Sequence, residues 1–449
     1  MMFDRCHSPV TLSKAQSLQD WNAMIQAFLA HGTATPLHLG AVLSSEPDFA
    51  MGHAARGLFS LMMGRAELVT TAREALAAAK AARVKGPVTR REALWIQGLE
   101  LWLQGRPSGV VMAMEEVLDA HPADTLSAKV SHAVRFILGD AKGMRRSIER
   151  ILPAHDTPHA FRGYLLGCHA FALEETGDYV LAEKTGREGL EYAPDDAWGL
   201  HAVAHVYDMT ARADKGIALI ENNKSAWDHC NNFRYHVWWH KALLHLDRAE
   251  FDVALGLYDA QIRADKTDDY RDISNATSLL VRLELEGIDV GARWEELADL
   301  SESRIDDGCV VFADLHYMLA LSGADRAEAR VAMATRFAKD ARRDGEMQAR
   351  YAHPGLAAVS GLNAFAEGRY EAAFTELSAA RPEMQTIGGS HAQRDVFERI
   401  TIDAGLRAGL FEQTQALLED RQAKRSGTVD RFTATRLDSI AAAQRIPAQ

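Results

Sequence analysis

GDYVLAEKTGREGLEYAPDD, residues 177–196, is the stretch that decides the fold of this chain. It begins with Gly177, the residue type that most often ends a helix, and it has Pro194, which cannot continue one, near its end. Tyr179 and Ala182 lie three residues apart, a spacing that puts both side chains on one face of a helix. The stretch therefore predicts a helix that starts just after a glycine turn, and we expect Gly177 itself at a tight helix contact.

Small residues with the same role recur along the chain: Gly64, Gly105, Gly139, Gly177, Ala211, Ala249, Gly287, Gly323, Gly368 and Gly409. Their spacings are 41, 34, 38, 34, 38, 38, 36, 45 and 41, which is typical of helix-turn-helix repeats. The residues around them resemble the tetratricopeptide pattern. Because one helix pair cannot bury its apolar face alone, neighbouring pairs share a long core. We predict an all-α fold, a tetratricopeptide-like α-solenoid of about ten helix-turn-helix units, curved or ring-like.

No stretch rich in Ser, Gly and Pro interrupts this periodicity, so the 449 residues favour one continuous array. We expect an irregular N-terminal segment over residues 1–20, a single α-helical repeat domain over 21–428, and a C-terminal cap or tail over 429–449. Polar end segments are expected because the ends of a solenoid face water.

The formal net charge of −12 argues against nucleic acid as a partner, because phosphate binding needs a concentrated basic face. Four cysteines without a C-x-x-C spacing suit a reducing cytoplasm. The N-terminus lacks an apolar signal region, and no run approaches 18 apolar residues. We therefore expect a soluble cytoplasmic protein with no membrane partner; formation of a homo-oligomer stays open.

Histidine and tryptophan gather in one window, between Trp198 and His245, which contains six of the 18 histidines and four of the eight tryptophans. His201 and His205 lie four residues apart, as do His236 and His240, so each pair stands on one face of a helix. Packed helices lie about 8–10 Å apart, close enough for two such pairs to share a metal ion. These four histidines could bind zinc or another divalent metal; the alternative is that they are hydrogen-bonded members of a pocket wall or core.

In tetratricopeptide units, family resemblance implies that certain positions of the first helix face the concave groove. That register places a patch of His, Trp and acidic residues on the inner surface of adjacent units: Glu174, Glu175, Trp198, His201, His205, Asp208 and His236. The predicted ligand-binding residues are these together with Trp239, His240, Asp314 and His316. Acidic and aromatic walls suit a cationic or hydrogen-bonding ligand. For Glu174 and Glu175 the alternative is a solvated helix end.

Three further segments carry weaker signals. Asp314 and His316 are two residues apart and therefore do not share a helix face, so at least one should be structural. Ser390 followed by Gln393 is a capping-box pattern that starts a helix, whose N–H groups could hold an anion near His391 and Arg394. Arg282 and Glu284 are most simply interpreted as surface charges.

The order of several segments resembles the tetratricopeptide repeat protein 38 family from about Arg91 to Asp395. These segments are AFALEETGDY, HAVAHVYDM, HVWWHKAL, LLVRLEL, FADLHYMLAL and GGSHAQRD. The resemblance implies an all-helical repeat fold in a soluble protein and implies no established reaction. Val237 and Val281 depart from the family pattern and should alter the shape of a pocket before they alter the fold.

Two classes of function remain. The first is a helical-repeat binding protein whose His/Trp/acid-lined concave pocket takes a small molecule or a peptide. The second is an enzyme, such as a metal-dependent hydrolase or lyase, that uses the same histidines and carboxylates. The sequence has no G-x-S-x-G, G-x-G-x-x-G or P-loop motif, which favours the binding protein.

Overall fold

The recurrent small residues end helices by adopting the left-handed backbone region. In the computed structural model, which describes residues 2–156 and 158–445, nine of the ten predicted positions have a positive φ: Gly64, Gly105, Gly139, Gly177, Ala211, Ala249, Gly287, Gly368 and Gly409. At the remaining position Asp325, with φ 51°, takes this role two residues after Gly323. The periodicity read from the sequence is therefore confirmed as a series of helix ends.

Gly177 shows how the first helix of one repeat ends and the second helix begins. Its N–H donates to Glu174 O at 2.9 Å, and the N–H of Asp178 donates to Leu173 O at 2.9 Å, which ends α9 (Arg162–Glu175). The Asp178 side chain then accepts from the N–H of Leu181 and starts α10 (Tyr179–Tyr192). No atom lies within 4 Å of the position that a Cβ on Gly177 would occupy, so the expected tight contact at this residue is wrong. Its role is conformational.

The close helix contact belongs to a different glycine of the same repeat. A Cβ on Gly186 would lie 2.5 Å from Cγ2 of Val203, in the facing helix α11 (Ala197–Met209). Only a residue without a side chain lets these two helices approach so closely.

The chain divides into two compact units. The first contains the described residues of Met1–Val203, Asn223–Arg234 and Asp344–Met347, and the second those of Ala204–Asn222, Tyr235–Arg343 and Gln348–Gln449. Three of the five divisions fall within helices, namely α11, α13 (Phe233–Asp247) and α19 (Glu346–Arg350), and the other two follow Asn222 and Arg343.

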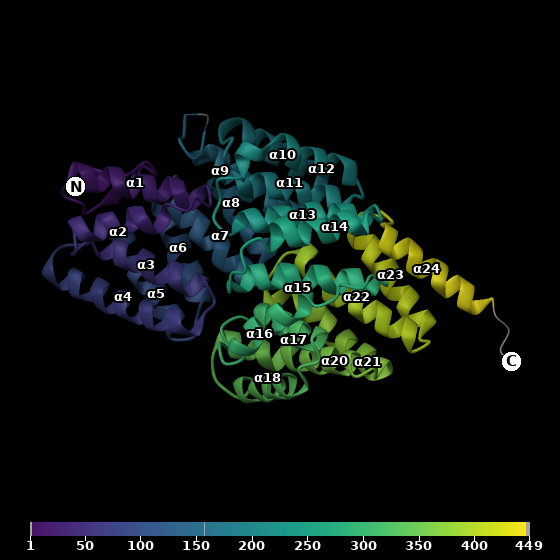
Figure 1. The fold of residues 1–449 in the computed structure, drawn as a ribbon. Coiled ribbons are helices and arrows are strands. Elements are labelled where there is room, and N and C mark those ends of the chain that lie inside the picture. The colour runs from purple at the N-terminus through teal and green to yellow at the C-terminus, as the bar shows by residue number, and fades with distance from the viewer. Residues whose placement is uncertain (1, 157, 446–449) are drawn as a thin grey trace. The chain divides into compact units, whose positions relative to one another are not determined.

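The first unit is built from consecutive helix pairs, coloured purple through blue to teal in Figure 1. A two-residue antiparallel ladder of β1 (Met2–Phe3) and β2 (Pro9–Val10) precedes them. The other elements are α1 (Ala15–Leu29), α2 (Thr35–Ser45), α3 (Ala50–Met62), α4 (Ala66–Lys85), α5 (Arg90–Leu103), α6 (Ser108–Ala120), α7 (Thr125–Ile137), α8 (Ala141–Ile151), η1 (Leu152–Ala154), α9, α10 and η2 (Lys224–Ala226). Its core includes the fully buried side chains of Trp21 and Trp95.

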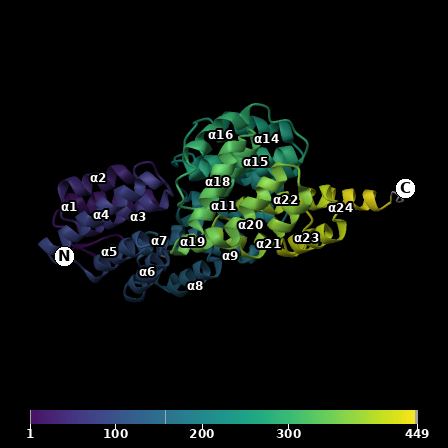
Figure 2. The same ribbon diagram turned by 90° about the horizontal axis from the view of Figure 1, so that it is seen from below.

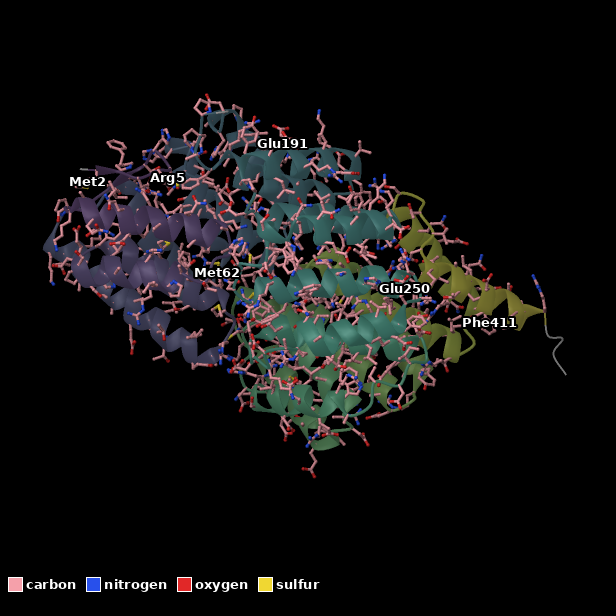
Figure 3. All side chains as sticks on the ribbon, turned by 45° about the horizontal axis from the view of Figure 1, so that its top comes forward. Met2, Arg5, Met62, Glu191, Glu250 and Phe411 are labelled. Carbon is pink, nitrogen blue, oxygen red and sulfur yellow. The ribbon has the colours of Figure 1, made fainter. Side chains whose placement is uncertain are left out.

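The second unit repeats the arrangement, and Figure 2 shows α20 and α21 as neighbours within it. Its elements are α12 (Ala213–Asn222), α14 (Phe251–Leu257), η3 (Tyr258–Ile262), α15 (Tyr270–Leu285), α16 (Arg293–Ser303), α17 (Val311–Gly323), α18 (Ala327–Asp340), η4 (Tyr351–Gly355), α20 (Leu356–Ala366), α21 (Tyr370–Ala380), η5 (Arg381–Ile387), α22 (His391–Arg407), α23 (Phe411–Lys424) and α24 (Arg431–Gln444). Figure 3 labels two residues at which the second helix of a helix pair begins. These are Glu250, just before α14, and Phe411, the first residue of α23. Helix α15 packs against both α17 and α22, which positions the site described below.

The predicted all-α helical-repeat fold is confirmed by this architecture. Helices also occupy parts of the end segments, since α1 begins at Ala15 and α24 spans Arg431–Gln444. Within residues 2–156 and 158–445, no helix combines the length and the apolar character needed to cross a membrane.

Candidate functional site

Glu174 and Glu175 are the last two residues of α9, in the first unit. Their side chains are buried, with 0% and 6% exposure. The solvated helix end considered from the sequence is therefore wrong. Carboxylates buried to this degree need nearby polar or charged groups, because removing an unpaired charge from water is costly.

Trp198, also in the first unit, stands at the centre of an aromatic group. Its ring centroid lies 4.6 Å from that of Phe171, 4.9 Å from that of His201 and 5.7 Å from that of Phe233. The ammonium of Lys129 lies 4.5 Å from the centre of the Trp198 ring, a cation–π contact made by a buried lysine. Trp198 and His201, both predicted site residues, thus lie together, and Lys129 joins them without a signal in the sequence.

His205, His236 and His240 form a compact group in the second unit. Helix α13 presents His236 and His240 one turn apart, with their Nε2 atoms separated by 3.1 Å. The rings of His205 and His240 lie 4.4 Å apart. One ligand atom from each of the three lies within 4.8 Å of the others. His201 precedes His205 by one turn of α11 and belongs to the first unit.

His236 is held from its other side by α15. Its Nδ1 lies 3.1 Å from Oδ1 of Asn275, and the same oxygen accepts from Nε2 of Gln393, on α22, at 3.5 Å. Burial and the neighbouring His205 lower the pKa of His236 to about 3. The imidazole is therefore neutral at physiological pH.

The predicted capping box at the start of α22 is confirmed. Ser390 accepts from the N–H of Gln393 at 3.3 Å, and Oε1 of Gln393 accepts from the N–H of Ser390 at 3.0 Å. Both residues are buried, so this helix start lies inside the second unit.

Trp239 and Arg282 are buried in the second unit and contact each other. The Arg282 guanidinium lies 5.6 Å from the centre of the Trp239 ring, donates to Ala392 O at 2.6 Å, and approaches Asp395 at 3.9 Å. Burial and the nearby Arg399 lower the pKa of Arg282 to about 9. The interpretation of Arg282 as a surface charge is wrong, because the residue is 1% exposed. Its position within the apolar run LLVRLEL was the available signal.

A cavity of about 290 Å³ adjoins this wall in the second unit. Ala392 and Asp395, which contact Arg282, belong to its lining. The charged residues of the lining are Asp208, Arg381, Arg394, Asp395, Glu398, Arg421, Lys424 and Arg425. Asp208 is thus placed on a cavity wall, where Arg425 lies 3.4 Å from its carboxylate.

Asp314 and His316 point to different neighbours, as their spacing on α17 predicts. Asp314 forms an ion pair of 2.6 Å with Arg336 and accepts from Tyr351. Nδ1 of His316 lies 2.7 Å from Phe312 O, and its ring lies 5.0 Å from that of Phe397. Asp314 has a structural partner, whereas His316 faces the helix that carries the cavity wall.

No protein-family model matches this chain. Among solved structures it is similar to a human IFIT1 dimer with PPP-AAAA, at 12% identity over 99% of this chain and 98% of that one, with a TM-score of 0.43. A human IFIT1 dimer with m7Gppp-AAAA matches at 14% identity over 89% and 95%, with a TM-score of 0.36. A likeness at this level carries no argument about a ligand of this chain. The resemblance to the tetratricopeptide repeat protein 38 family stays a prediction.

The exclusion of nucleic acid that was drawn from the net charge is not kept. Both of these solved proteins are named with oligonucleotides, which is a property of those proteins and assigns no nucleic acid to this chain. The physical reason is that a formal charge of −12 sums over the whole chain and does not describe local surfaces. The cavity lining is an example, since it contains five Arg and Lys residues and three acidic ones.

Proposed function

We propose that this chain is a helical-repeat binding protein whose second unit holds a small molecule or a short peptide through an anionic group, a carboxylate or a phosphate. The observation that carries this proposal is the excess of buried cationic charge beside the cavity. The carboxylate of Asp395 lies 2.6 Å from Arg399, 3.0 Å from Arg421 and 3.9 Å from Arg282. Arg399 and Arg421 also contact Asp430, at 3.9 Å and 2.8 Å, so these three guanidinium groups share two carboxylates. Arg282 is the least neutralised of the three, which agrees with its lowered pKa.

Hydrogen-bond donors favour the same class of ligand. Trp239 Nε1, Asn275 Nδ2 and Arg282 Nε are buried, and none of these atoms has a hydrogen-bond partner in the part of the chain that the structure describes. All three are donors only, and each buried donor without a partner costs about 1–3 kcal/mol. Arg282 contacts two residues of the cavity lining, Ala392 and Asp395, so an acceptor oxygen that reaches Arg282 from the cavity would give its Nε a partner. In the second unit these groups favour an anionic ligand over the cationic one suggested by the sequence.

The Arg282→Met variant tests the proposal. In the wild-type chain, pyrophosphate or citrate should raise the melting temperature, because binding at 100 times Kd stabilises the folded state by about 2.7 kcal/mol. The variant should lose this response. Its melting temperature without ligand should stay close to that of the wild type, because replacing a poorly neutralised buried charge by an apolar side chain is often neutral or stabilising.

The matched control is Arg369→Gln, at an arginine whose side chain is 56% exposed and which does not line the cavity. It should keep the response to both anions. Spermidine, as a cationic probe, should give no stabilisation that depends on Arg282. A short 5′-phosphorylated oligonucleotide in the same titration tells whether the anionic group can belong to a nucleic acid. Equal responses to pyrophosphate and citrate in Arg282→Met and wild type would contradict the proposal.

A further inference from the structure

The start of α22 determines, through Asn275 of α15, which ring nitrogen of His236 carries the hydrogen. The N–H of Ser390 donates to Oε1 of Gln393, so the other end of that amide, the NH2 group of Nε2, faces Asn275. A donor at this position requires an acceptor opposite, which fixes the Asn275 amide with Oδ1 toward Gln393. The same Oδ1 lies 3.1 Å from Nδ1 of His236. The hydrogen of His236 therefore stands on Nδ1, and the lone pair stands on Nε2.

That lone pair points into the group of three histidines. Nε2 of His240 lies 3.1 Å from Nε2 of His236, and the ring of His205 packs on that of His240. Two nitrogens that bind one zinc ion at about 2.0–2.1 Å with a tetrahedral angle lie about 3.3–3.4 Å apart. The observed separation of 3.1 Å is within a few tenths of an ångström of that value. Only small rotations of the two rings would bring both nitrogens onto one ion.

We propose that His205, His236 and His240 of the second unit bind one divalent d-block metal ion, of which zinc is the representative, with Asn275 as the positioning residue. Three neutral imidazoles are a ligand set that suits zinc, copper, iron and nickel, whereas calcium and magnesium require oxygen ligands. A histidine that binds metal generally donates its other ring N–H to a fixed acceptor, and Asn275 supplies that acceptor here. Three protein ligands leave a further position for water or for another ligand.

This inference goes beyond the proposed binding of an anion. The metal site uses three histidines of α11 and α13 with Oδ1 of Asn275 as the acceptor for His236, whereas the anion proposal rests on Arg282 and the cavity wall. Either proposal can fail without the other.

The experiment uses the full chain without a histidine tag. After treatment with a chelator, the protein is titrated with Zn²⁺ against a chromophoric chelator, and with Co²⁺ while its visible absorption is followed. We expect one metal ion per chain and a Co²⁺ spectrum typical of nitrogen ligands. His236→Ala combined with His240→Ala should bring binding below detection, whereas His245→Ala on the same helix, which removes the partner of Glu250 at 2.6 Å, should leave it unchanged.

A matched pair at Asn275 tests the positioning role. Asn275→Leu removes the acceptor and should weaken Zn²⁺ binding about 10–100-fold. Asn275→Asp keeps an acceptor and should restore the affinity, a pattern that a purely structural role would not give. Circular dichroism and thermal unfolding verify that each variant is folded. Wild-type affinity no tighter than that of the double histidine variant would overturn the metal site, and equal affinities of Asn275→Leu and wild type would overturn the role of Asn275.

Discussion

At the scale of single residues, the backbone at helix ends sets strict requirements. Gly177 has φ +83° and Ala249 has φ 58°, so both positions lie in the left-handed region. A residue with a Cβ pays a steric penalty there that glycine avoids. Both residues are exposed, and a Cβ on Gly177 would have no atom within 4 Å. Substitutions at these two positions therefore report on backbone conformation and not on packing.

Replacing Gly177 by alanine and Ala249 by glycine should therefore change the free energy of unfolding in opposite directions. We expect Gly177→Ala to lower the free energy of unfolding by about 1 kcal/mol and Ala249→Gly to raise it by up to about 1 kcal/mol. Urea unfolding of both variants, followed by circular dichroism, measures the difference. Ala358→Gly, within α20, is the control for the general effect of glycine and should destabilise. Equal signs for Gly177→Ala and Ala249→Gly would contradict the assignment of both as helix-ending positions.

Residue types also explain which parts of the site could be predicted. The four-residue spacing of His236 and His240 fixes their common helix face, so their proximity follows from the sequence. The roles of Arg282 and Gln393 could not be predicted, because both depend on contacts between α15 and α22, more than a hundred residues apart in the chain. Asp314 was included for its residue type and its place on a predicted first helix, and its contacts with Arg336 and Tyr351 depend on tertiary packing.

At the scale of helices, ion pairs hold the last three helices of the second unit together. Asp430 accepts from the N–H of Thr433 at 2.9 Å as the cap of α24, and it lies 2.8 Å from Arg421 of α23. Burial alone would raise the pKa of Asp430, but Arg421, Arg425 and Arg399 hold it well below its usual range. Arg421 in turn contacts Asp395 of α22 at 3.0 Å. One buried carboxylate thus serves as helix cap and as a bridge between helices.

A depressed pKa makes this stabilisation depend on pH. The folded state binds the proton of Asp430 more weakly than the unfolded state does, so the contribution is fully present above the unfolded pKa of about 3.9 and is lost as the pH falls below it. Asp430→Asn should lower the free energy of unfolding at neutral pH by about 3–5 kcal/mol, because it removes one partner of a buried ion pair. The deficit relative to wild type should shrink in acid.

Urea unfolding of wild type and Asp430→Asn at about pH 7 and about pH 3 measures both values. Asp438→Asn, on the same helix, is the control for loss of a carboxylate that does not cap the helix. A deficit that stays constant between the two pH values would show that the carboxylate charge is not the source of the stability.

At the scale of the whole molecule, the period of the glycine positions was enough to predict the architecture, because each repeat has to end its helix by the same backbone conformation. The division into two compact units had no signal of that kind. The helices α11 and α13, in which divisions fall, continue the regular helical pattern through the point of division. A boundary set by the density of long-range packing leaves no mark on local periodicity.

Each unit has its own hydrophobic core, so a core substitution in one unit should destabilise mainly that unit. Trp95 is fully buried in the core of the first unit and donates to Oγ of Ser127 at 3.0 Å; Phe337 is fully buried in the core of the second. Trp95→Ala should cost about 3–5 kcal/mol. In a repeat protein, stability is a sum of local terms, so this loss should appear first near the substitution.

Hydrogen exchange followed by mass spectrometry distinguishes local from global loss. In Trp95→Ala, amide protection should fall in α3, α5 and α6, whereas α15 and α17 should keep the protection that they have in the wild type. Phe337→Ala should give the reverse pattern, with α15 and α17 affected and α3 and α5 unchanged. If either variant lost protection equally in both sets of helices, the two units would unfold as one cooperative body, and the local character expected of a helical-repeat chain would not apply to this one.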